Sequence, residues 1–95
     1  MEIKIKSLKF DADKKLVAFV EKKVTRLEKF FAGAEPAAEV TLSLEKDAKA
    51  AKIQIHVPGD EMIIERSSKT FEDAITECVD AMKEKLTRAK EKKQG

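Results

Sequence analysis

The sequence predicts an α+β domain in which two helices pack on one face of a four-stranded mixed sheet. Apolar and polar residues alternate in four short segments, and apolar residues recur at helical spacing in two longer ones. In chain order these segments read β-α-β-β-β-α. A right-handed crossover through the first helix makes the first two strands parallel, whereas the short connections that follow favour an antiparallel meander.

The first strand is predicted at the N-terminus. Ile3 and Ile5 alternate with charged residues, as in a strand that is buried on one face only. Leu8 and Phe10 extend the apolar content toward the end of this segment. The same alternation rules out a signal peptide, which would need a continuous apolar stretch.

The first helix should begin at Asp13, because an aspartate before an apolar periodic segment is a favoured N-cap. Its one-sided stripe predicts about five helical turns. The stripe consists of Leu16, Phe19, Val20, Val24, Leu27, Phe30 and Phe31. Gly33, within an Ala-Gly-Ala-Glu-Pro segment, is the expected C-cap.

Three further strands follow, at residues 40–44, 53–57 and 62–66. The first two alternate clearly, and the Pro58-Gly59-Asp60 turn separates the last two. In the fourth strand Met62, Ile63 and Ile64 are consecutive, so the pattern does not decide which side chains face inward. The spacing of these strands fits two hairpins in succession.

The second helix is predicted from about residue 70 to residue 93, with Thr70 and Asp73 resembling a capping box. Its stripe consists of Phe71, Ala74, Ile75, Cys78, Val79, Met82, Leu86 and Ala89. Such a helix is roughly 36 Å long, whereas a six-residue strand spans about 20 Å. The C-terminal turns should therefore project beyond the sheet.

Length and charge set the broad class of the protein. The 95 residues suit a single domain, expected to span residues 1–95, and the net charge is only +2. Positive charge is concentrated, because residues 83–93 hold six basic and two acidic side chains. One cysteine fits a reducing compartment, and no apolar run has the length of a membrane span. We therefore expect a cytoplasmic protein that is not membrane-bound.

Catalytic chemistry is not indicated by this sequence. His56, the only histidine, falls on the polar side of the third strand, and Cys78 falls within the second apolar stripe. A surface histidine and a buried core cysteine are the simpler interpretations. No Cys/His cluster or Gly-rich phosphate loop is present. We expect no enzyme activity, no cofactor, no metal and no small-molecule substrate.

The basic residues are more informative than the catalytic candidates. Lys23 falls inside the apolar stripe of the first helix, where an ammonium must extend to solvent, pair, or face a groove. Other cations flank both stripes. An ordinary solvated helix face, or lysines favoured by the dipole of a helix C-terminus, would explain some of them. The predicted phosphate-binding set is Lys22, Lys23, Arg26, Lys29, Lys83, Lys85, Arg88, Lys90 and Lys92.

Together with the motifs given below, these basic residues make the sequence similar to the ribosome hibernation-promoting factor family. This family is also called the ribosome-associated inhibitor or sigma-54 modulation family. The resemblance spans nearly the whole chain. It rests on the order and spacing of several short motifs. These are Leu16, Phe19-Val20, Lys23, Leu27-Glu28, Phe30-Phe31, the strands at 40–44 and 53–57, Phe71 with Ala74-Ile75, and the basic end from Leu86 to Lys92.

The resemblance implies a fold similar in arrangement to double-stranded RNA-binding domains. It also implies binding to the 30S decoding channel, on 16S rRNA within 70S ribosomes, where the protein blocks mRNA and tRNA binding under stress or in stationary phase. The positions carried over by the family match are Lys23, Arg26, Arg88, Lys90 and Lys92. We expect a protein that is monomeric off the ribosome.

Two positions depart from the family pattern. Glu84 stands where many members have arginine, and Ala89 stands where a basic residue or histidine is frequent. The length fits a short form of the family. Two other functions remain open on the residues alone: a generic duplex-RNA-binding module, and a protein-interaction domain that uses the open sheet face.

Overall fold

The four strands of the protein form a single mixed sheet. The computed structural model describes residues 1–31, 35–57 and 59–94, without the side chains of residues 89–94. Strand order in the sheet is β1-β2-β3-β4, with β1 parallel to β2 and the other neighbours antiparallel. The predicted α+β fold and its element order are confirmed. The strands are β1 (Glu2–Leu8), β2 (Ala37–Leu44), β3 (Lys49–Val57) and β4 (Asp60–Ser68).

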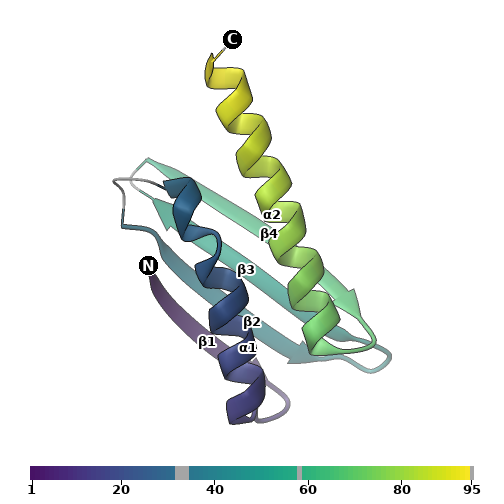
Figure 1. The fold of residues 1–95 in the computed structure, drawn as a ribbon. Helices are drawn as coiled ribbons and strands as arrows, with labels where there is room; N and C mark the ends of the chain where they lie inside the picture. The colour runs from purple at the N-terminus through teal and green to yellow at the C-terminus, as the bar shows by residue number, and fades with distance from the viewer. Residues whose placement is uncertain (32–34, 58, 95) are drawn as a thin grey trace.

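Two helices, α1 (Lys14–Thr25) and α2 (Phe71–Gln94), lie on the same face of this sheet, as Figure 1 shows. α2 packs on β3 and β4, and α1 packs against α2 and β1. Between the two layers lies one apolar core, in which each fully buried Leu, Ile or Val contributes about 1.5–3 kcal/mol. Its fully buried members include Val20, Val24, Leu27, Val40, Leu42, Ile53, Ile55, Ile75, Cys78 and Met82.

The register of β4 settles the side-chain direction that the sequence left open. Ile64 pairs with Ile53 of β3 and is only 6% exposed, so its side chain joins the core. Ile63 is 47% exposed and therefore lies on the open face of the sheet. Alternation in a strand has a period of two, so a one-residue change of register would exchange these two faces.

Both helices begin at the residues that the sequence indicated. The Asp13 carboxylate accepts a hydrogen bond from the backbone N–H of Leu16 at 2.8 Å, and Asp13 itself has extended backbone angles. The Thr70 hydroxyl accepts one from the N–H of Asp73 at 3.0 Å. Each bond satisfies an N–H that has no partner within the helix. The expected C-cap, Gly33, lies outside the described residues.

The end of the first helix differs from the prediction of five continuous turns. α1 ends at Thr25, and a short 3₁₀ helix, η1 (Glu28–Phe31), follows. The N–H of Leu27 bonds to the carbonyl of Val24, and that of Phe30 to the carbonyl of Leu27. These tighter turns align side chains three residues apart, which keeps Leu27 buried and Phe30 packed against the core.

The segment after β1 also differs from a simple continuation of the strand. β1 ends at Leu8, which is 49% exposed, and Lys9 adopts a left-handed backbone conformation with φ of 70°. This turn brings Phe10 back beneath the helices, where its ring stacks on that of Phe71 with centroids 4.4 Å apart. A non-glycine residue in this conformation is uncommon, and the aromatic contact helps to hold it.

The N-cap bond gives a direct test of the fold. Replacing Asp13 with alanine leaves the N–H of Leu16 without its partner, so the free energy of unfolding should fall by about 1 kcal/mol. Urea denaturation followed by circular dichroism measures this change. Asp11→Ala, at an exposed position that caps no helix, should change stability by less than about 0.5 kcal/mol. Equal losses in the two variants would contradict the capping role.

Candidate nucleic-acid interface

The predicted phosphate-binding residues come from two helices that run in the same direction. α1 returns antiparallel to β1, and α2 returns antiparallel to β4, while β1 and β4 have the same direction in the sheet. The C-terminal halves of both helices therefore point to the same end of the molecule (Figure 1). The basic residues predicted on the two helices are concentrated in these halves.

We call this set of described side chains the basic surface. All seven of its members fall within or after the last turn of α1 or in the second half of α2. Most are exposed, and the two half-buried ones sit closer to the core. The basic surface consists of Lys22, Lys23, Arg26, Lys29, Lys83, Lys85 and Arg88. The side chains of Lys90 and Lys92, also predicted to bind phosphate, lie outside the described residues.

Lys23 shows how a cation is accommodated inside an apolar stripe. Its side chain is half-buried, and the ammonium nitrogen lies 5.6 Å from the centre of the Phe19 ring. The aliphatic stem thus covers apolar surface while the charge rests against the negative face of an aromatic ring. Lys29 makes a similar contact with Phe30, at 5.5 Å. These contacts orient two cations without neutralising them.

Pairing differs between the two helices. Among the described side chains, no carboxylate forms an ion pair with the basic-surface residues Lys22, Lys23, Arg26 and Lys29. On α2, by contrast, Arg88 donates a 2.7 Å hydrogen bond to the Glu84 carboxylate one turn earlier. Both side chains of this pair are largely exposed. Glu84, which departs from the family pattern, is therefore already paired with Arg88, one of the cations predicted to bind phosphate.

α2 extends beyond the layer that it covers. It has 24 residues against 12 in α1, which corresponds to roughly 36 Å and 18 Å of helix. Figure 1 shows its C-terminal turns projecting past the sheet and past the end of α1. Lys85 and Arg88 are exposed in the C-terminal half of this helix. A projecting cationic helix can enter a groove in RNA, where it meets phosphates on more than one side.

His56 and Cys78, the two residues considered for catalysis, lie in the surroundings of ordinary surface and core residues. His56 is exposed and lies 3.9 Å from the Glu61 carboxylate, to which Gln54 also donates a hydrogen bond. Cys78 is fully buried, and its thiol donates to the carbonyl of Ala51 at 3.3 Å. Burial raises the pKa of Cys78 to about 11, so the reactive thiolate is disfavoured. Both positions agree with the surface and core interpretations from the sequence.

Two other kinds of site are absent from the described part of the chain. Within it, no three His, Cys, Asp or Glu side chains lie together as a metal site requires. Nor does any described helix have the length of apolar sequence needed to cross a bilayer. What the described surface does offer is a set of exposed cations, several of them without an ion pair among the described side chains.

Comparison with known proteins decides the family. Residues 3–94 match the family model described as sigma 54 modulation protein / S30EA ribosomal protein. The chain belongs to this family. It is a family of ribosome-associated proteins that function in ribosome hibernation and translation regulation, and it is not an enzyme family. The sequence-based recognition of the family is thereby confirmed.

Solved structures agree with this membership. The N-terminal domain of Protein Y from Thermus thermophilus is 28% identical, with a TM-score of 0.83 over 93% of this chain and 98% of that chain. A ribosomal subunit interface protein from Coxiella burnetii has a TM-score of 0.85 over 95% of this chain and 98% of its own, at 17% identity. The second likeness establishes the fold alone. No curated protein sequence matches the chain.

Sequence reasoning missed two features of this surface. The ion pair between Glu84 and Arg88 was foreseeable, because oppositely charged residues four apart on a helix are neighbours. The stacking of Phe10 on Phe71 was not, because it joins residues 61 positions apart through a backbone turn at Lys9 that no local pattern indicates.

Proposed function

We propose that this S30EA-family protein is a ribosome hibernation factor that binds the 30S decoding channel and blocks mRNA and tRNA. The observation that carries the proposal is the convergence of cations from two parallel helices at one end of the molecule, with those of α1 free of ion pairs among the described residues. The resemblance stated from the sequence supplies the site on the ribosome. Family membership makes a ribosome the natural partner.

The mechanism is steric and electrostatic. Phosphates of 16S rRNA bind the basic surface, and the body of the domain occupies space that message and tRNA need. Contacts of this kind position a protein without reading bases, and each displaces counterions from the RNA. The protein acts as a cytoplasmic monomer without catalysis, and residues 1–95 form one ribosome-binding domain. Lys90 and Lys92, also predicted from the sequence to bind phosphate, belong to the same helix.

Co-sedimentation with isolated 30S and 70S particles across a salt series tests this function. We expect near-stoichiometric pelleting at low salt, a steep loss of binding as salt rises, and displacement by tRNA together with mRNA. A generic duplex-RNA module would instead be displaced by excess duplex RNA. If the protein fails to pellet at low salt, the ribosomal function is wrong.

Charge reversal in the C-terminal half of α2 tests the basic surface. The double variant Lys85→Glu, Arg88→Glu should weaken 30S binding at least tenfold and lower the slope of log affinity against log salt by about 2. The matched control is Lys4→Glu, Lys6→Glu, which makes the same change of net charge on the open face of the sheet. Comparable losses in both variants would rule out a helix-borne surface.

The Glu84–Arg88 pair gives a prediction in the opposite direction. Glu84→Gln removes the competitor of the phosphate for Arg88, so 30S affinity should rise roughly two- to fivefold, as expected for release of an exposed ion pair. Glu77→Gln, also exposed on α2, changes the net charge equally without touching Arg88. Competition sedimentation measures both variants. An equal gain from each would mean that net charge alone sets the affinity.

A further inference from the structure

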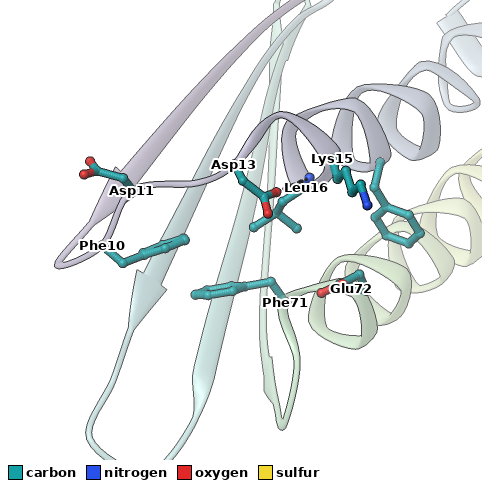
Figure 2. Close-up of a pocket in the computed structure, with 8 residues that line it drawn as sticks. Phe10, Asp11, Asp13, Lys15, Leu16, Phe71 and Glu72 are labelled. Carbon is teal, nitrogen blue, oxygen red and sulfur yellow. Dashed lines mark hydrogen bonds between the residues drawn. The ribbon is translucent and has the colours of Figure 1, made fainter.

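A groove lies at the end of the molecule opposite to the basic surface. It lies where both helices begin, between the start of α1 and the first turn of α2. Figure 2 shows the rings of Phe10 and Phe71 side by side at its base, with Leu16 above them. Its lining residues are Phe10, Asp11, Asp13, Lys15, Leu16, Phe19, Phe71 and Glu72.

Two properties of the groove must be explained together. Its floor is apolar, because three phenyl rings and Leu16 contribute to the lining. Its charged residues are three carboxylates and one lysine, so the lining is acidic on balance. Helix dipoles account for carboxylates at these two N-termini. They do not account for the partly exposed apolar side chains of Phe10, Leu16 and Phe19 beside those carboxylates.

The charge of the groove decides which class of partner it can take. RNA phosphates are repelled by its carboxylates, so the groove cannot serve as a second phosphate site. A long cationic side chain fits both properties, because its aliphatic stem packs on apolar surface while its charged head meets a carboxylate. Ammonium groups of this protein already rest on two of the lining rings, Lys23 on Phe19 and Lys49 on Phe71, so Phe10 and Leu16 are the apolar side chains left for a further stem.

We propose that this groove docks a basic peptide segment, with an arginine or lysine side chain laid along Phe10 and Leu16 and paired with Asp13 and Glu72. The interaction is independent of the basic surface and lies at the other end of the helices. On a ribosome, whose surface presents protein as well as RNA, it gives the domain a second contact with a basic protein segment. The ribosomal part of this statement rests on the proposed function.

The first experiment uses the isolated protein and a fluorescein-labelled peptide of alternating arginine and leucine. Fluorescence anisotropy should show saturable binding that the double variant Asp13→Asn, Glu72→Gln weakens about tenfold. Asparagine keeps the N-cap, so the helix is retained, and urea denaturation verifies this. The control Glu61→Gln, Glu65→Gln removes two exposed carboxylates from β4 and should change binding less than twofold. Absence of saturable binding, or equal loss in the control, overturns the proposal.

The second experiment distinguishes a protein partner from RNA by whether the variant pellets with 30S particles more weakly or more strongly than the control. In 30S co-sedimentation, Asp13→Asn, Glu72→Gln should weaken pelleting relative to the Glu61→Gln, Glu65→Gln control, although both remove two negative charges. Stronger pelleting than the control would mean that the groove faces RNA, and would overturn the proposal. Failure of the wild-type protein to pellet refutes only the ribosomal function, because the peptide experiment still decides the groove.

The remaining alternative to a separate peptide is a second copy of this chain, since its basic α2 could enter the acidic groove head to tail. Sedimentation equilibrium over a range of protein concentrations tests this alternative. Self-association that Asp13→Asn, Glu72→Gln abolishes would assign the groove to that copy and overturn docking of a separate peptide. A monomer throughout the range supports the proposal.

Discussion

The parallel pairing of β1 with β2 is the constraint on which the rest of the molecule depends. A parallel pair requires a crossover, and α1 supplies it by running back along the sheet. Two antiparallel pairings then leave β4 in the direction of β1, so α2 returns in the direction of α1. Both helices consequently start at one end of the sheet and point to the other. Basic residues separated by more than fifty positions in sequence reach the same end by topology alone.

This arrangement also explains why the basic end is built from helix and not from sheet. The core stripe of α2 is buried up to Met82, and Leu86 is still packed against the core. Exposed charged side chains of this half of the helix, such as Lys85 and Arg88, stay solvated and carry no desolvation cost. Cations near a helix C-terminus are also favoured by the dipole. Stability and the proposed phosphate binding therefore favour the same residue types at this end.

Sequence patterns were sufficient for most of the fold because periodicity and capping are local. The strands, the Asp13 cap and the buried Cys78 all follow from the spacing of neighbouring residues. The end of α1 could not be predicted, because Leu27 and Phe30 fit an α-helical stripe and a 3₁₀ turn equally well, and packing against the core selects the second. The stack of Phe10 on Phe71 depends on contact between distant segments.

The candidate site could be predicted from the sequence to a similar extent as the fold. Helical periodicity placed Lys23 within the apolar stripe, and the structure resolves the conflict by resting its ammonium on Phe19. Periodicity alone did not reveal that Arg88 is already paired, since a face that carries both charges can either pair them or leave each to solvent. The pairing depends on rotamers, and these follow from the surface around each side chain, which a linear pattern does not contain.

A net charge of only +2 is compatible with two oppositely charged ends because of the length of the molecule. The principal extents are 44 × 22 × 20 Å, and the helices run between an acidic groove at one end and the basic surface at the other. At physiological ionic strength the Debye length is about 8 Å, so charges at opposite ends are screened from each other. A phosphate near Arg88 therefore responds to the cations of α1 and α2, and hardly to the carboxylates near Asp13. Separation along the helices, and not net charge, sets what each end can bind.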